Sequence, residues 1–434
     1  MRFIHTSDWH LGKTLEGRSR ISEQERFCED FVKLVEEKEV ELVIIAGDIY
    51  DTYNPPAQAE KLFYKTISKL ADNGRRCVFI ISGNHDNPDR LSASVPLASE
   101  QGIIILGKPR SEAEIGEYKN FKVIEAKEGC TKLEIGGEKV TIISLPYPSE
   151  KRLNEILESK EEDKEEKKEL EFEIDTSESS SEVEDKVETK ATESSSEDEK
   201  RQVTYSMKIG EMFEQLQGEF EDDSINIAVS HIFVTGGDAS ESERPIQLGG
   251  SLLVEKKDLP DRAQYIALGH LHKPQKASER LSAYYSGSPL QYSKDERNYA
   301  KGANIVDIHP GERPVVEKIY FKNYKPIELF KCNGVTEAIK ICEENADREI
   351  WSFFEISTDE VISTTDLKLM KDRLKDIIEI KPIIKDRERE EQTDIKEKSM
   401  AQLFSEFYLF SKGVEPKGEL MDLFLNIISE EGEF

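Results

Sequence analysis

Cysteine and histidine are scarce in this chain, whose 434 residues include five cysteines and seven histidines. The cysteines are odd in number and scattered, and no two form a C-x-x-C pair, which argues against a disulfide framework or a thiolate zinc site. No apolar run approaches the ~20 residues that cross a bilayer, and the first residues lack the apolar stretch of a secretory signal. These absences indicate a cytoplasmic protein with reduced thiols and no membrane segment.

Positive charge is also scarce, since 60 Lys and Arg residues face 89 Asp and Glu residues, a net charge of −29. Nucleic-acid binding usually needs a basic surface. Residues 161–200 hold 18 acidic and 6 basic residues with many serines, which takes −12 of the total and leaves −17. A segment this polar has too few apolar residues to offset the chain entropy that is lost on folding. We therefore predict a disordered surface insert over about 155–202. A phosphate ligand would need metal ions or a partner to supply positive charge.

The length allows two or three domains. Residues 1–325, apart from the insert, alternate strand-like and helix-like segments, which predicts a layered α/β core. Residues 326–386 read strand, helix, strand, helix, strand and predict a small α+β module. Residues 387–434 hold a charged linker and two amphipathic helices with apolar side chains at i, i+4 and i+7.

Within the core, the apolar spacing predicts helices over 23–37, 56–74 and 205–216. The stretch KLEIGGEKVTIISLPY predicts a hairpin that turns at Gly136 and Gly137.

Five apolar strands of the predicted core end in residues that can bind a metal. Sites in open α/β sheets form at the carboxyl ends of strands. Five of the seven histidines lie at such ends; the exceptions are His5, expected in the core, and His309, expected at the surface. The residues at the five ends are Asp8, His10, Asp48, Asn84, His85, His231, His270 and His272.

The stretch GHLH at 269–272 contains two of these histidines. It follows the apolar run QYIAL, and residues i and i+2 of an extended chain face the same side. His270 and His272 would therefore aim two imidazoles, which are common metal ligands, at one place. Taken alone, the motif fits two polar residues in a surface loop better than it fits a metal site. The evidence is the ordered set of five strand ends.

The donor set contains oxygen and nitrogen without thiolate, which suits Mn²⁺, Fe²⁺ or Zn²⁺ in a reactive site. It holds more ligands than one ion needs, and two ions that share a carboxylate account for the number. Asp48, from the middle of the set, is the obvious bridge. Two ions roughly 3.5–4 Å apart clamp the attacking and leaving oxygens in phosphoester hydrolysis. The sequence therefore predicts a metallophosphoesterase.

The motifs D-x-H, G-D-x-x-D, G-N-H-D, a lone His and G-H-x-H resemble the calcineurin-like metallophosphoesterase superfamily, a β-sandwich flanked by helices. The resemblance implies that His85 stabilises the transition state or protonates the leaving oxygen, and that Asp51 orients it. It implies one ion on Asp8, His10, Asp48 and His272, and a second on Asp48, Asn84, His231 and His270.

More specifically, HTSDWHLGK, GDIYDTYNPPAQA, SGNHDNPDRL, ALGHLHKPQ and YYSGSPLQYSKDERNYAKGANIVDI are similar to the SbcD family, the nuclease subunits of bacterial SbcCD complexes. The similarity covers 1–155 and 203–325 and extends loosely to 326–386 as a capping domain. It implies a Mn²⁺-dependent DNA nuclease of repair, recombination and replication. The implied activities are an ATP-dependent 3′→5′ exonuclease on double-stranded ends, a single-strand endonuclease and hairpin opening.

The chain has no G-x-x-x-x-G-K-[ST] motif, so ATP would be hydrolysed by an SbcC-like coiled-coil ATPase partner. We expect the two C-terminal helices to dock that partner; the alternative is that they fold back on their own core. The family also implies a homodimer within a heterotetramer, formed near residues 90–100. Phosphate contacts are expected from loops around the metals. The candidates are Lys13, Arg18, Arg20, Arg90, Lys273, Ser286 and Ser288.

Two other functions stay open on the sequence. A different calcineurin-like phosphoesterase, acting on nucleotides or phosphoproteins, would keep every ligand but would need no capping module or docking helices. An inactive scaffold for an ATPase would have lost ligands, and none of the ligand positions is altered.

Overall fold

The structure, a computed structural model, describes residues 1–153, 194–240, 242–243, 252–359 and 361–384, with 404–405, 408, 416 and 420–421 beyond them. The chain divides into two compact units. The first contains every ligand candidate and comprises Met1–Phe330, Asp347–Phe353 and Asp376–Glu379. No helix among the described residues is long and apolar enough to cross a bilayer.

The first unit is built on two sheets, and the first of these has the strand order β18-β17-β1-β4-β5-β6. Strands β1, β4, β5 and β6 are parallel. Strand β17 pairs antiparallel with β1, and β18 pairs antiparallel with β17. The central strands are apolar and fully buried, as strands covered on both faces must be. Their bounds are β1 Arg2–Thr6, β4 Leu42–Ala46, β5 Cys77–Ile81, β6 Ile103–Leu106, β17 Gly302–Asp307 and β18 Val315–Tyr320.

The second sheet has the order β15-β16-β14-β11-β10-β9-β8-β7. Strands β10, β11, β14 and β16 are parallel to one another. Strand β15 pairs antiparallel with β16, and β9, β8 and β7 continue the other edge with each strand antiparallel to its neighbour. The predicted hairpin at Gly136 and Gly137 is confirmed as the turn between β9 and β10. The bounds are β7 Gly116–Glu117, β8 Phe121–Lys127, β9 Cys130–Ile135, β10 Glu138–Leu145, β11 Ser224–His231, β14 Tyr265–Gly269, β15 Gln275–Ser278 and β16 Ala283–Tyr285.

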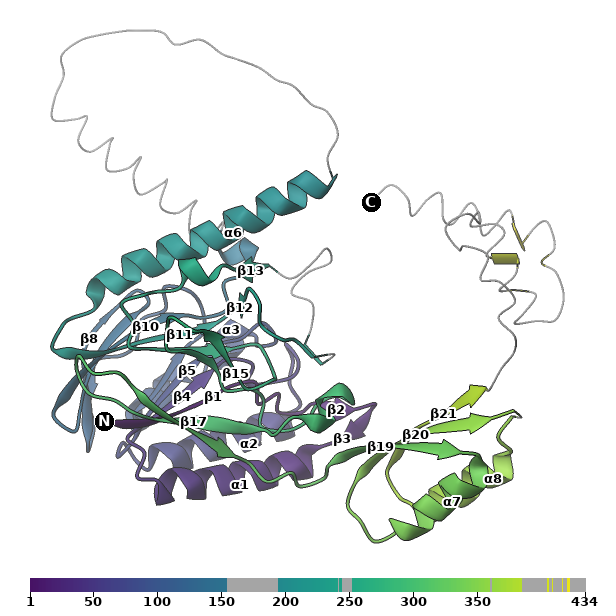
Figure 1. Cartoon of the computed structure of the whole chain (residues 1–434). Coiled ribbons are helices and arrows are strands. Elements are labelled where there is room, and N and C mark those ends of the chain that lie inside the picture. Colours follow the sequence, from purple (N-terminus) through teal and green to yellow (C-terminus); the bar gives the residue numbers. More distant parts are fainter. Residues whose placement is uncertain are drawn as a thin grey trace, which may run out of the picture. The chain divides into compact units, whose positions relative to one another are not determined.

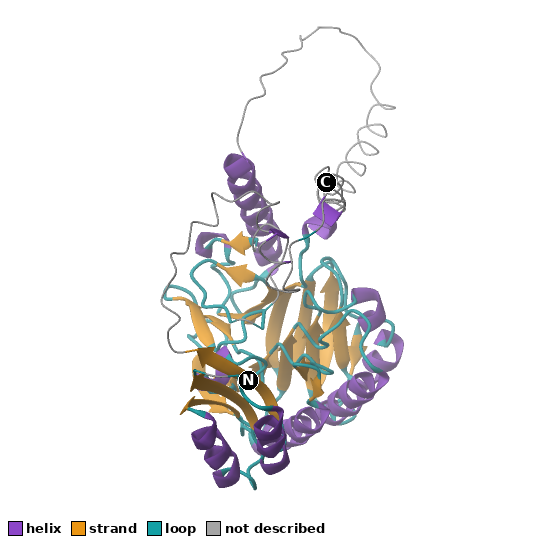
Figure 2. Ribbon diagram, turned by 90° about the vertical axis from the view of Figure 1, so that its right-hand side faces the viewer, coloured by secondary structure: helices purple, strands orange, loops and turns teal. Residues whose placement is uncertain are grey.

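Figures 1 and 2 show the two sheets and the helices that flank them. Three apolar layers stabilise this arrangement. The sheets pack face to face through side chains such as Phe79 and Ile227. The helices α1 (Ile21–Glu37) and α2 (Ala57–Ala71) cover the outer face of the first sheet. Helix α6 (Ser194–Leu216) covers the second sheet with its buried residues, among them Phe213. The predicted helix-flanked β-sandwich is therefore confirmed.

Shorter elements complete the first unit. The pairs β2 with β3 and β12 with β13 each form a small two-stranded sheet. The bounds are β2 Thr14–Leu15, β3 Arg18–Ser19, α3 Pro88–Ser92, α4 Val95–Ala98, η1 Ser99–Gln101, η2 Gln217–Glu219, β12 Phe233–Val234, β13 Leu253–Val254, η3 Lys256–Asp258 and η4 Asp295–Asn298.

The α+β module shows the element order that its sequence predicts. It contains a three-stranded sheet, order β19-β20-β21, and two helices. Its elements are β19 Ile327–Asn333, α7 Val335–Glu344, β20 Trp351–Thr358, α8 Thr364–Arg373 and β21 Ile377–Ile384.

One prediction about the acidic insert is wrong at its end. Helix α6 begins at Ser194, so residues 194–202 are helical rather than disordered. This segment contains no Gly or Pro, and acidic residues near a helix N-terminus are favourable, so the packed part of α6 can extend into it. Residues 154–193 lie outside the described residues, as do most positions of the two predicted C-terminal helices.

Candidate metal centre

The ligand candidates lie together where the carboxyl ends of the two sheets meet. In the first sheet they follow β1, β4 and β5; in the second they end or follow β11 and β14. Six of the seven are at most 3% exposed, and Asn84 is half-buried. In chain order they are Asp8, His10, Asp48, Asn84, His231, His270 and His272.

Asp86 ties two of the ligand loops of the first sheet together. Its carboxylate accepts hydrogen bonds from the main-chain N–H groups of Ile49 and Tyr50, at 3.1 and 2.9 Å, and of Gly83 at 2.8 Å. Burial raises the Asp86 pKa to about 6, with the nearby Asp48 charge adding to the shift and the three N–H donors opposing it. This residue therefore holds the loop of Asp48 against the loop of Asn84.

Glycines precede the ligands because the backbones approach too closely for a side chain. A Cβ at Gly83 would lie 2.1 Å from Asp48 Oδ1, and a Cβ at Gly269 would lie 1.8 Å from the Ala46 carbonyl oxygen. Real Cβ atoms do not occupy such distances, so the motifs G-N-H and G-H-x-H require glycine on steric grounds.

The backbone of four ligands is held in an unfavourable conformation. The φ angles are +54° at Asp8, +44° at His10, +51° at Asp48 and +110° at His270. Non-glycine residues at positive φ cost energy and persist where the surrounding structure holds them, commonly at functional sites. Here the hydrogen bonds Asp8 N to Gly47 O and His10 N to Asp48 O, both 3.0 Å, supply that support.

One group of donors joins Asp8, His10 and His272, whose ligand atoms all lie within 4.8 Å of one another. His10 Nε2 lies 2.9 Å from His272 Nε2 and 3.6 Å from Asp48 Oδ2. Two imidazole nitrogens at that separation converge on one point. This arrangement fits the ligand set implied for the first ion.

A second group lies beside the first. His231 Nε2 lies 2.9 Å from Asn84 Oδ1 and 3.5 Å from Asp48 Oδ2. His270 Nδ1 lies 3.3 Å from the same Asn84 oxygen. Asp48 Oδ2 is therefore near His10 on one side and His231 on the other, as a shared ligand must be.

The charges of the cluster fit divalent cations. Asp8 and Asp48 are buried, and no Lys or Arg among the described residues forms an ion pair with either. Burial alone would raise the Asp48 pKa, but the surrounding imidazoles, His231 first, hold it well below its ordinary value. Burial lowers the His270 pKa to about 3, so its ring is neutral and can donate a lone pair. Burial would lower the His231 pKa, but the Asp48 carboxylate raises it to about 9, so this ring must give up its proton to bind a cation. Two buried carboxylates beside these imidazoles form a dimetal site of His and Asp donors.

His85 lies at the edge of this cluster and faces it. Its Nε2 is 4.0 Å from Asp48 Oδ2. Its Nδ1 lies 2.7 Å from the main-chain oxygen of Asp51, whereas the Asp51 carboxylate is 3.9 Å away and binds Lys13 Nζ at 2.8 Å. Asp51 thus contacts the ring through its backbone, a difference from the carboxylate orientation that the family resemblance implied.

The candidate phosphate contacts differ in how accessible they are. Ser286 and Ser288 are fully buried, with hydrogen bonds to Ser7 Oγ at 2.8 Å and to the Leu290 carbonyl at 2.9 Å. Neither serine presents its hydroxyl to solvent. The structure therefore contradicts the predicted phosphate contacts of Ser286 and Ser288.

The arginine and lysine candidates also fall into two groups. Arg20 is 1% exposed and forms a buried ion pair with Glu23. Its guanidinium also lies over the ring of Tyr292. It is therefore not available to a phosphate. Arg90, Lys13 and Lys273 are paired with Glu60, Asp51 and Asp238, respectively. Arg18 is exposed, and no ion pair joins it to the described residues.

Several residues that lie behind the candidate ligands were not predicted from the sequence. Besides Asp86, they include Glu296 and Lys301, which lie behind His272, and Tyr292, whose ring packs edge-on against His10. The available signal was the stretch YSKDERNYAKG, whose similarity to the SbcD family carried no chemistry by itself.

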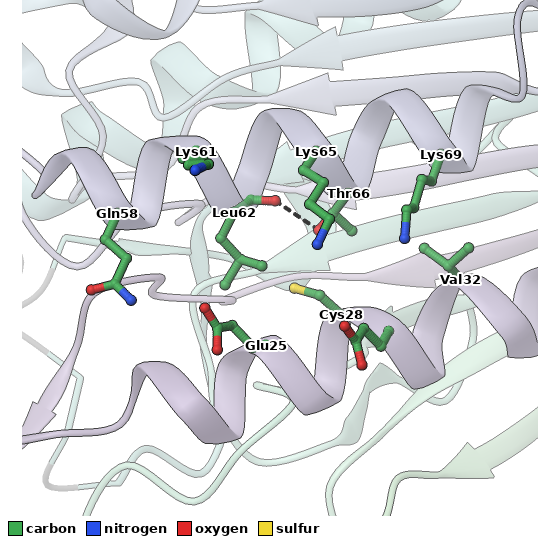
Figure 3. Close-up of a pocket in the computed structure, with 10 residues that line it drawn as sticks. Glu25, Cys28, Val32, Gln58, Lys61, Leu62, Lys65, Thr66 and Lys69 are labelled. Atoms are coloured by element: carbon green, nitrogen blue, oxygen red, sulfur yellow. Dashed lines mark hydrogen bonds between the residues drawn. The ribbon is translucent and has the colours of Figure 1, made fainter.

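A groove between α1 and α2 lies apart from the ligands (Figure 3). Carboxylates of Glu25 and Glu29 line it on one helix, and ammonium groups of Lys61, Lys65 and Lys69 on the other. It contains no histidine, and we assign it no part in the metal chemistry.

Comparison with known proteins agrees with the fold and the donor set. The family model described as calcineurin-like phosphoesterase matches residues 1–274, which include every ligand candidate. The β-sandwich and its cluster of His, Asp and Asn at the strand ends are thus those of a calcineurin-like phosphoesterase.

A relative makes the assignment more specific. The chain is 37% identical to SbcD of the nuclease SbcCD from Bacillus subtilis (strain 168) over 434 residues, which are 99% of this chain and 98% of the relative. The chain therefore belongs to the SbcD family of metal-dependent phosphoesterases. A solved dimetal phosphatase from Danio rerio is 12% identical with a TM-score of 0.38, covering 73% of this chain and 95% of its own, and is too distant to add to the assignment.

Proposed function

We propose that this chain is the nuclease subunit of an SbcCD-type complex and hydrolyses DNA phosphodiester bonds with two divalent ions, for which Mn²⁺ is the favoured metal. The observation that carries the proposal is the position of Asp48 Oδ2, 3.6 Å from His10 Nε2 and 3.5 Å from His231 Nε2. It supports a shared ligand between two donor groups, in a chain related to an SbcD protein along nearly its whole length.

Each of the two ions would have its own set of ligands. Asp8, His10, Asp48 and His272 would hold one ion, and Asp48, Asn84, His231 and His270 the other. When bound, such a pair supplies positive charge to the scissile phosphate and to the attacking and leaving oxygens. Cation binding also offsets the negative charge of this acidic chain, which otherwise opposes DNA.

His85 would be the proton-transfer residue. Its Nδ1–H donates to the Asp51 carbonyl oxygen at 2.7 Å, which fixes the ring and turns Nε2 toward the ligand cluster. Nε2 is then the atom placed to give a proton to the leaving oxygen. The Asp51 carboxylate, bound to Lys13, would hold the loop that carries this carbonyl.

The remaining activities follow from the family and stay proposals. With an SbcC-like coiled-coil ATPase, the chain would act as an ATP-dependent 3′→5′ exonuclease on double-stranded ends, and it would cut single strands and open hairpins. Residues 326–386 would be the capping domain, 387–434 would dock the ATPase, and two copies would form a homodimer within a heterotetramer. Contacts from Arg18, Lys13, Arg90 and Lys273 to the DNA backbone would carry no base readout, so cutting would depend on DNA structure.

Cleavage of an end-labelled DNA hairpin with Mn²⁺ tests the function, for wild type and His85→Ala, each with and without the ATPase partner and ATP. We expect wild type to cut, and the variant to bind metal normally but to cut about 10²–10⁴-fold more slowly, the usual worth of a general acid. Hydrolysis of a small phosphoester without any cleavage of DNA would contradict the nuclease assignment and retain the site.

A further inference from the structure

The stretch around η4 lies behind the candidate ligand His272. Glu296 and Lys301 stand five residues apart, are 0% and 6% exposed, and form an ion pair through Glu296 Oε2 and Lys301 Nζ. Neither residue is a candidate metal ligand. A buried ion pair contributes little net stability compared with apolar side chains, so its presence beside a metal ligand calls for another reason.

The carboxylate determines which nitrogen of His272 carries the proton. Glu296 Oε1 lies 3.3 Å from His272 Nδ1 and also accepts a hydrogen bond from the Ser242 hydroxyl. Ser242 Oγ in turn lies 2.6 Å from His272 Nδ1. Because an ionised carboxylate can only accept, the Ser242 proton points at Glu296, and the serine oxygen is left to accept from Nδ1–H. The lone pair of His272 is then on Nε2, the nitrogen 2.9 Å from His10 Nε2.

Lys301 completes this arrangement in two ways. It neutralises Glu296, which would otherwise be a buried, unpaired charge. Its Nζ also donates to the main-chain oxygen of His272 at 2.9 Å and to Ser288 Oγ at 2.8 Å. The same short stretch therefore holds both the ring and the backbone of one ligand. His231 needs no such pair, because its Nδ1 lies 2.9 Å from the carbonyl oxygen of Ala46.

We propose that the Glu296–Lys301 ion pair is a positioning device for the metal centre: it fixes the tautomer and the aim of His272, and thereby the affinity of the one ion that His272 holds. The partner that orients a metal-binding histidine typically contributes roughly 10–100-fold to affinity or activity. The inference rests on the proposed dimetal site but goes beyond it, since it assigns a role to two residues that bind neither metal nor DNA.

Calorimetric titration of Mn²⁺ into the metal-free protein, together with its thermal midpoint, tests this role. We expect wild type to bind two ions and Glu296→Gln to bind one of them roughly 10–100-fold more weakly, with the other unchanged. A glutamine amide can donate to Ser242 and reverse the hydrogen-bond direction, which would place the His272 proton on Nε2. Lys301→Met should weaken the same ion, because it leaves Glu296 without its counter-charge.

The double variant Glu296→Gln with Lys301→Met separates positioning from stability. It leaves no unpaired charge, so the thermal midpoint should recover towards that of the wild type while the affinity for the one ion stays low. The matched control is Glu23→Gln, which removes the charge that pairs with buried Arg20 but keeps an oxygen that can accept from Trp351 Nε1. It should lower the midpoint and leave both affinities unchanged.

Wild-type affinity for both ions in the double variant would overturn the proposal and make the pair purely structural. Equal weakening of both ions would also overturn it, because His272 belongs to only one ligand group. A wild type that binds no Mn²⁺ would overturn the site and the inference together. A wild type that binds two ions but does not cut DNA would overturn the nuclease function alone, and the inference would still be decided by the titration.

Discussion

The two sheets contribute unlike candidate ligands to the metal centre. The first sheet supplies all the oxygen donors, namely Asp8, Asp48 and Asn84, and one imidazole, His10; the second supplies three imidazoles and no carboxylate. The carboxylates among the candidate ligands are therefore confined to one side of the sandwich. The other side provides imidazole nitrogens whose value as ligands depends on how they are aimed.

The two sides are also held differently. On the first, ligand loops are tied by main-chain hydrogen bonds and by Asp86, close to the strands themselves. On the second, His231 and His272 each need a partner from another part of the chain, Ala46 in one case and Glu296 in the other. The contrast teaches that contacts to main-chain groups fix the ligand loops of the first sheet, whereas separate partners aim the imidazoles of the second.

Removal of the shared oxygen should have the largest effect. Asp48→Ala takes a ligand from both donor groups, so we expect both ions to be lost, with Mn²⁺ affinity reduced by more than about 100-fold, beyond the loss of an outer partner. Calorimetry measures this directly. His270→Ala, from the second sheet, should weaken one ion only; equal damage by both variants would contradict the shared role of Asp48.

Disturbing the contact between the sheets should come next. Gly269→Ala places a Cβ 1.8 Å from the Ala46 carbonyl oxygen, so we expect a cost of about 1–3 kcal/mol in the free energy of unfolding and weaker binding of metal. Gly137→Ala is the control, because its Cβ would meet nothing within 4 Å and only its φ of +84° is strained. It should cost about 1–2 kcal/mol and leave metal binding intact.

A buried histidine between the sheets that is not a candidate ligand should make the stability of the fold depend on pH. His5 is buried in β1 with Nδ1 3.0 Å from Tyr265 Oη of β14, and burial lowers its pKa to about 3. Because the ring is neutral when folded but protonates near 6.5 when unfolded, its contribution to stability is present above pH 6.5 and is lost as the pH falls towards 3.

The corresponding experiment compares wild type with His5→Gln by chemical unfolding at pH 7.5 and 5.5. Wild type should lose about 1.4 kcal/mol more than the variant for the one pH unit below 6.5. Identical pH dependence of the two proteins would show that His5 is not kept neutral by burial.

The smallest effect is expected at the surface. Arg18, in the short strand β3, is exposed, whereas Lys273, which follows β14 on the second sheet, is paired with Asp238 at 2.5 Å. Arg18→Ala should therefore weaken DNA binding more than Lys273→Ala and lower the salt-dependence slope by about 0.9, as for one lost phosphate contact. Fluorescence anisotropy at several salt concentrations measures both. A larger effect from Lys273 would place the DNA on the side of the second sheet.

Much of the fold and of the candidate ligand set follows from local sequence features. Buried apolar strands that end in Asp, Asn or His predicted the sheets and the residues that gather at their ends. The insert boundary was predicted too late in the chain, because the composition of 194–202 is polar, and a helix that packs further along can still extend into such a segment.

The sequence by itself determined that glycines precede Asp48, Asn84 and His270 and that candidate ligands gather at five strand ends. Strand periodicity and motif order are local properties, so they can be read from the sequence alone. Only the tertiary structure decided that Asp48 Oδ2 lies between two imidazoles, that Arg20 and Ser288 are buried, and that Glu296 lies behind His272. These facts depend on contacts between residues far apart in the chain, such as His231 and Ala46, 185 positions apart, and a linear pattern does not encode the burial that such contacts create.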